Sequence, residues 1–139
     1  MKKNFFRIIS FILILTMLMP VAAMAIETRT NPYIAYYVAT IKAIGDGKIR
    51  VGFDVTGTGD MEKIGTTQIK IYDENGYLKK TYRPSSYDGL LAENTFCHSG
   101  NVVFQGTVGV SYFAKVTCFA QGADGSSTET YTTTLVEAE

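Results

Sequence analysis

The sequence predicts an all-β protein, an antiparallel β-sandwich of seven or eight strands. Apolar residues recur at every second position beyond the N-terminal segment, which is the period of a half-buried strand. Glycine-bearing turns separate these segments about every 8–14 residues, a spacing typical of sandwiches. A small β-barrel is the alternative architecture with the same local signals.

The first strands are defined by alternation and by turn residues. Residues 33–44, YIAYYVATIKAI, could be drawn as an amphipathic helix, but their β-branched and aromatic content favours a strand. The turn GDGK at 45–48 leads into residues 48–55. Four apolar side chains there point to one face: Ile49, Val51, Phe53 and Val55.

The later strands follow the same rule. Residues 67–73 alternate, and Asn75-Gly76 predicts a hairpin to the strand at 77–82. Residues 84–95 are expected to form a crossover loop. Further strands are predicted within 101–106, 109–122 and 128–136. One face of the second of these carries small and apolar residues: Tyr112, Ala114, Val116, Cys118 and Ala120.

The N-terminus has the pattern of a cleaved export signal. A basic start precedes an apolar run at 8–19, and Ala23-Met24-Ala25 matches the small-x-small cleavage pattern. The run is too short for a comfortable membrane span. We expect residues 1–25 to be a cleaved signal peptide and residues 26–139 to be one domain, secreted or held at the cell surface.

The charge of the expected mature chain argues against nucleic-acid binding. Three of the thirteen basic residues, Lys2, Lys3 and Arg7, lie in the signal, which leaves ten basic against thirteen acidic residues and a formal charge of −3. The sequence contains no basic cluster that could neutralise a phosphate backbone. No membrane association is expected after cleavage.

One short segment sharpens the prediction of the fold. Gly109 lies three residues before Tyr112, which opens a strand, and this spacing resembles the tyrosine corner of immunoglobulin-like and fibronectin type III sandwiches. The resemblance implies a buried ring whose hydroxyl group bonds to the upstream backbone. The tryptophan typical of immunoglobulin cores is missing.

A second resemblance covers nearly the whole mature chain. The export signal, NPYIAYY, GDGKIRVGFDVTGTGDMEKIG, IKIYDENG and GVSYFAKVTCFAQGADG together resemble small exported proteins of Gram-positive bacteria that have no assigned function. The resemblance implies an exported β-sandwich and supplies no catalytic residue.

The segment NTFCHSG raises the question of a thiol site, because Cys97 is next to His98, the only histidine. Neighbouring residues of a strand point to opposite faces, so the ring would not reach the sulfur there, although in a loop it could. Two cysteines in a small exported domain are typically paired. We therefore predict a Cys97–Cys118 disulfide, with His98 as a surface side chain; two free thiols or a reactive thiol are the alternatives.

Other catalytic or metal chemistry has little support. A serine triad would have to use His98, the only histidine, and no Gly-x-Ser-x-Gly motif occurs. One histidine and two cysteines are too few for a zinc site. Paired carboxylates remain available for hydrolysis, but no two are marked as opposed. Calcium is a weaker possibility at five residues near strand ends: Asp60, Glu62, Asp73, Glu74 and Asn75. We expect no enzyme activity, no metal and no cofactor.

Tyrosine is the unusual feature, with nine residues. Exposed tyrosines beside cations are common in recognition surfaces, although tyrosines also cover the solvent faces of sheets. The predicted binding residues are Tyr77, Lys79, Tyr82, Arg83 and Tyr87. We expect a non-catalytic interaction module whose partner is an extracellular protein, with a carbohydrate less favoured because tryptophan is absent. A self-assembling structural protein, or a small exported hydrolase, is the alternative.

Overall fold

The structure is a computed structural model that describes residues 31–139. The predicted signal peptide, residues 1–25, lies outside the described residues. The described chain forms seven strands and no helix. They are β1 (Ile34–Ala43), β2 (Lys48–Asp73), β3 (Leu78–Tyr82), β4 (Leu91–Gln105), β5 (Ser111–Gly122), β6 (Gly125–Thr132) and β7 (Val136–Glu137).

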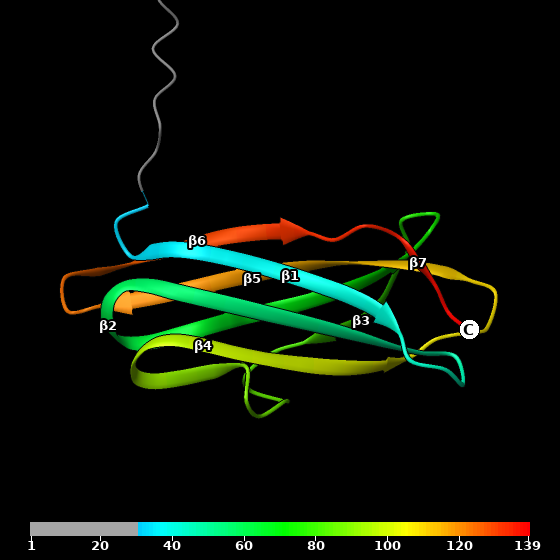
Figure 1. Cartoon of the computed structure of the whole chain (residues 1–139), viewed down its shortest axis with the longest axis horizontal. Coiled ribbons are helices and arrows are strands. Elements are labelled where there is room, and N and C mark those ends of the chain that lie inside the picture. The colour runs from blue at the N-terminus through cyan, green and yellow to red at the C-terminus, as the bar shows by residue number, and fades with distance from the viewer. Residues whose placement is uncertain (1–30) are drawn as a thin grey trace, which may run out of the picture.

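All seven strands belong to one antiparallel sheet that curls into a half-barrel (Figure 1). The curl comes from β2, whose pairing with β4 shifts register between Thr56 and Met61. Before this bend β2 pairs with β1 and with residues 97–105 of β4. We call these three paired segments the front layer. After the bend it pairs with β3 and β5, which with β6 and β7 form the back layer.

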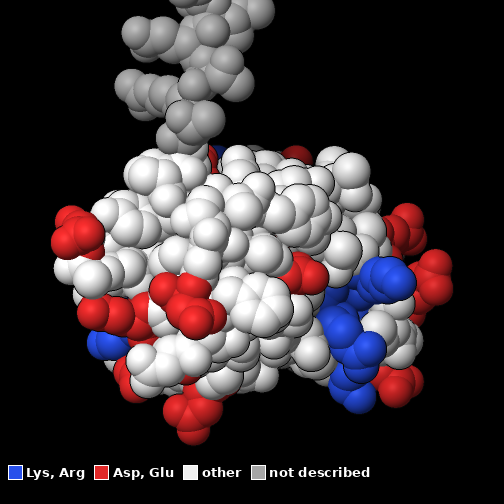
Figure 2. Space-filling view, turned by 60° about the vertical axis from the view of Figure 1, so that its left-hand side comes forward, with Lys and Arg blue, Asp and Glu red and all other residues white. Residues whose placement is uncertain are grey.

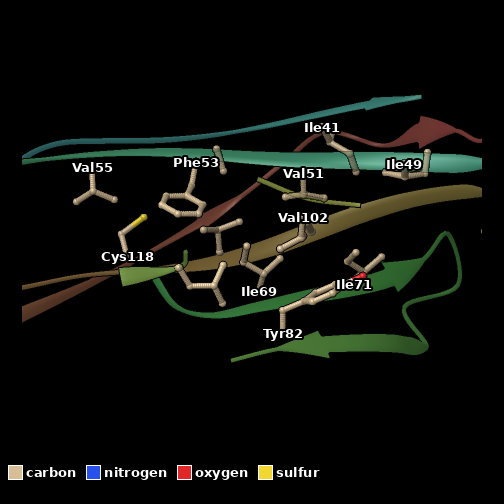
Figure 3. Packing of buried hydrophobic residues seen from close by; sticks show 14 of the residues in the cluster. Ile41, Ile49, Val51, Phe53, Val55, Ile69, Ile71, Tyr82, Val102 and Cys118 are labelled. Atoms are coloured by element: carbon tan, nitrogen blue, oxygen red, sulfur yellow. The ribbon is translucent and has the colours of Figure 1, made fainter. Parts of the chain in front are cut away.

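The core lies between the two layers. The alternating residues of β2 point inwards on both sides of the bend, so that Val51 and Phe53 of the front layer face Ile69 and Ile71 of the back layer (Figure 3). The inward face of β5 completes the core with five buried residues: Tyr112, Ala114, Val116, Cys118 and Ala120. The predicted inward faces of residues 48–55 and of this strand are confirmed.

Several local predictions are confirmed and three boundaries were wrong. One is the strand predicted within 128–136, since β6 ends at Thr132 and the next strand, β7, begins at Val136. The strand at 33–44 exists as β1, and both predicted turns join antiparallel strands. The predicted segments 48–55 and 67–73, however, are parts of the single strand β2, because residues 57–60 bend it without ending it. The expected loop at 84–95 is shorter, since residues 91–95 pair with β2 as the start of β4.

Aromatic residues occupy the places where the curled sheet is not closed by strand pairing. Tyr37 of β1 and Tyr131 of β6 meet edge to face across the two ends of the sheet, with ring centroids 6.4 Å apart. Tyr112 is buried, and its hydroxyl oxygen accepts a hydrogen bond from the Thr107 N–H at 2.9 Å. The ring and the upstream hydrogen bond of Tyr112 have the geometry that the sequence predicts.

Glycine is required where the loop before β4 crosses β2. Gly65 has a φ of +140°, and a Cβ atom there would collide with the carbonyl oxygen of Leu90. That same oxygen accepts a hydrogen bond from the Thr66 N–H at 2.8 Å, which fixes the close approach. The backbone conformation and the crossing therefore both exclude a side chain at this position.

We predict that Gly65→Ala lowers the free energy of unfolding by about 2–4 kcal/mol, because it adds backbone strain to overpacking. Urea unfolding measures this loss. The matched control is Gly59→Ala in the same strand, where a Cβ atom meets nothing within 4 Å. Equal unfolding midpoints for the two variants would contradict the crossing described above.

Candidate functional site

The Cys97–His98 pair does not form a thiol site. Cys118 is fully buried on the inward face of β5. Cys97, by contrast, occupies an outward-facing position of β4, on the same face as Asn101 and Val103. The two sulfurs thus leave opposite faces of the curled sheet, and both cysteines are free. The predicted disulfide is absent from the structure for this reason.

His98 points inwards instead of lying free on the surface. Its ring packs beside Phe53, with centroids 5.6 Å apart, and Nε2 lies 2.7 Å from the carbonyl oxygen of Gly89. A carbonyl oxygen only accepts, so Nε2 carries a proton in this contact. The imidazole holds the loop before β4 and is directed away from the neighbouring thiol.

The β2–β3 hairpin positions the first two predicted binding residues. Asp73 is buried and accepts hydrogen bonds from the N–H groups of Asn75 and Tyr77 at 3.0 and 2.9 Å. Its other carboxylate oxygen lies 2.9 Å from Nζ of Lys79. Lys79 therefore neutralises a buried carboxylate, while Tyr77, 68% exposed, is free at the tip of the hairpin.

The other three predicted residues lie at the far end of β3. Tyr82 is 8% exposed and donates its hydroxyl proton to the carbonyl oxygen of Val103 at 2.9 Å. Burial, and then the neighbouring Tyr87, raise the pKa of Tyr82. Tyr87 packs edge to face on that ring with centroids 5.3 Å apart, and Arg83 is exposed. Tyr82 fills the gap between β3 and β4, and its ring offers little surface to a partner.

A different group of side chains forms a continuous surface on the outside of the back layer. Tyr72 of β2 stacks on Phe113 of β5, with ring centroids 5.2 Å apart and an interplanar angle of 11°. Nζ of Lys115 lies 5.5 Å from the centroid of Tyr72, and Lys70 is the direct cross-strand partner of Lys115. We call these four residues the basic–aromatic face.

The charges of this face are not balanced locally. Lys70 and Lys115 are directly opposite each other, an arrangement that destabilises a strand pair. Their outer neighbours in the same row are Thr81 and Thr132. Among the described residues only two ion pairs form, Lys48–Asp46 and Lys79–Asp73, so neither lysine of the face has a carboxylate partner.

Arg83 joins this face to the predicted residues. With the amide oxygen of Gln68 turned towards it, the guanidinium donates two hydrogen bonds of 3.2 Å. Gln68 precedes Lys70 on the same outward side of β2. Arg83 is thus the predicted binding residue that adjoins this face, and none of the five belongs to it. The sequence signal for Tyr72 and Lys70 was their outward parity, but their neighbours on β5 could not be known without the register.

The acidic residues considered for calcium do not come together. No group of three or more His, Cys, Asp or Glu side chains within residues 31–139 is placed to hold a metal ion. Asp73 and Glu74 lie at the hairpin, whereas Asp60 and Glu62 lie at the bend of β2.

Within residues 31–139, no helix is long and apolar enough to cross a membrane.

Comparison of the chain with protein-family models, with curated proteins and with solved structures found no match.

The hairpin predicts an acid-dependent loss of stability. The hydrogen bond from Lys79 is the main cause that lowers the pKa of Asp73, helped by the N–H groups of Tyr77 and Asn75. The stabilisation is complete above the ordinary carboxyl pKa of 3.8 and is lost as the pH falls through the lowered value. Urea unfolding of the wild type and of Asp73→Asn from pH 7 to pH 2 should show a stability difference that shrinks below about pH 4. A constant difference over that range would contradict the role of the charged form.

The free cysteines predict a specific labelling pattern. Burial raises the pKa of Cys118 to about 12, so its thiol should resist alkylation until the protein unfolds, while the half-buried Cys97 should react first. Intact-mass measurement after alkylation without reduction should show one adduct under native conditions and two in denaturant. Labelling that requires prior reduction would establish a disulfide and contradict the free thiols.

Proposed function

We propose that the mature chain is an exported, non-catalytic interaction module whose basic–aromatic face binds an acidic segment of an extracellular protein. The observation that carries the proposal is the direct pairing of Lys70 with Lys115 beside the Tyr72–Phe113 stack. This arrangement costs stability in the free protein, and an anionic partner would remove the cost. Aromatic residues and cations are also enriched in protein interfaces.

We also propose that the curled sheet is an immunoglobulin-like sandwich. The hydrogen bond from the Thr107 N–H to the buried Tyr112 supports it, as do the two facing layers of the sheet. The resemblance to small exported Gram-positive proteins and the signal-like segment at 1–25 support export. Secretion and a location outside the cell are part of the same proposal.

The non-catalytic part of the proposal rests on the placement of the reactive side chains. His98 is engaged with the Gly89 carbonyl oxygen, and Cys97 lies on the opposite face of β4. The thiol of Cys118 is enclosed by the core. Nucleophilic catalysis requires a nucleophile within hydrogen-bond reach of its base, and the sole histidine has neither thiol in that position.

The proposal is tested by selecting peptides from a randomised display library against the wild-type protein. The selected sequences should be enriched in Asp and Glu with interspersed aromatic residues. The double variant Lys70→Gln/Lys115→Gln should bind them about tenfold more weakly, since charge-assisted contacts are lost. Its free energy of unfolding should rise by about 0.2–1 kcal/mol, because the opposed charges are removed.

The matched control is Lys42→Gln/Lys48→Gln, which makes the same change in net charge on the front layer. This control should retain the affinity of the wild type. Selected peptides without acidic enrichment, or equal affinity losses for the two double variants, would reject the basic–aromatic face as the binding surface.

A further inference from the structure

The outer face of the front layer contains a shallow groove of about 380 Å³ with both apolar and polar groups in its lining. It lies across the three strands β1, β2 and β4, on the side of the front layer that faces away from the core. Nine residues line it: Val38, Thr40, Arg50, Gly52, Phe53, Asp54, Ser99, Gly100 and Asn101. Its volume lies at the small end of the range for small-molecule sites, about 300–1,000 Å³.

Gly52 forms the floor of the groove between Thr40 and Asn101, its partners on the two neighbouring strands. The register is regular through Gly52 on both sides, so the residue marks neither a bulge nor a bend. A Cβ atom there would lie 2.9 Å from the hydroxyl oxygen of Thr40, an exposed residue on the wall of the groove, with the Gly100 carbonyl oxygen next at 3.7 Å. A side chain at this position would therefore displace Thr40 and fill the groove.

Gly100 shows the contrast. A Cβ atom on Gly100 would lie 2.7 Å from the ring of Phe53, so the core itself excludes a side chain there. A glycine inside a strand is also found where a ligand approaches the backbone closely. At Gly52 a side chain would fill the groove, whereas at Gly100 it would enter the core.

The two ends of the groove carry opposite charges. Arg50 and Asp54 lie on the same outward side of β2, two residues before and two after Gly52. Four residues of strand place their Cα atoms about 13 Å apart, and both side chains can lean towards the floor. Figure 2 shows a group of Lys and Arg side chains towards the right, with Asp and Glu side chains on both sides of it.

We propose that this groove binds a short peptide of about three residues through both of its free termini. An extended tripeptide is about 10 Å long, which suits the spacing of the two charges. Its carboxylate lies at Arg50 and its ammonium group at Asp54. The hydroxyl and amide groups of Thr40, Ser99 and Asn101 bond its peptide groups, while Val38 contacts its side chains.

The experiment is a titration of the ¹⁵N-labelled protein with trialanine, followed by NMR. Chemical shifts of the amides at 50–54 and 99–101 should move. N-acetylation or C-amidation of the peptide should each weaken binding about tenfold, because each removes one charged contact. Arg50→Gln should bind the free and the C-amidated peptides with equal affinity.

The variant Gly52→Val tests the role of Gly52 as the floor of the groove. Its side chain would fill the groove and should abolish the binding of trialanine. Gly59→Val is the matched control, since Gly59 lies in the same strand next to open space. The variant Lys70→Gln/Lys115→Gln should bind trialanine like the wild type, which separates this proposal from the function of the opposite face. Equal binding of free and doubly capped trialanine, no shift of these amides, or wild-type affinity in a folded Gly52→Val protein would overturn it.

Discussion

The fold depends on a single strand that builds both walls of the core. Because β2 continues through the bend at 57–60, its inward positions before the bend face its inward positions after it. Val51 and Phe53 thus pack towards Ile69 and Ile71 of the same strand (Figure 3). Every other strand except β6 and β7 pairs with β2, so the register of that strand positions the whole sheet. Gly65 belongs to this constraint, since it lets the loop before β4 close over β2 just beyond the bend.

A curled sheet that does not close leaves gaps at its free edges, and tyrosines fill them. Tyr37 and Tyr131 meet where β1 lies alongside β6, the two strands that are neighbours in Figure 1. Tyr82 with Tyr87 closes the gap beside β4. A tyrosine suits such a place because its ring packs on the core while its hydroxyl group satisfies a backbone group at the edge. The bond from Tyr82 to the Val103 carbonyl oxygen does this on β4. Much of the tyrosine content that suggested recognition therefore serves closure of the sheet.

Local features of the fold were predictable because they depend on neighbours in the sequence. The alternation of apolar and polar residues predicted the inward face of β5. Asn75-Gly76 predicted the hairpin in which Asp73 accepts backbone hydrogen bonds. Long-range features were not predictable, because they depend on which layer a residue joins. Cys118 was placed correctly in the core, but the sequence left open whether Cys97 lies in a strand or a loop. The face on which Cys97 lies is defined only by the pairing of β4 with β2. The candidate surface shows the same limit, since the pairing of Lys70 with Lys115 is a property of register, not of sequence spacing.

The two proposed surfaces both include outward positions of β2. Gly52 lies before the bend and Lys70 after it, each at an outward position of the strand whose inward positions build the core. The bend turns these two segments into opposite layers, so the groove and the basic–aromatic face point in opposite directions. A peptide in the groove and a partner on the back layer would therefore not compete for space. The geometry therefore allows both surfaces to be occupied at the same time.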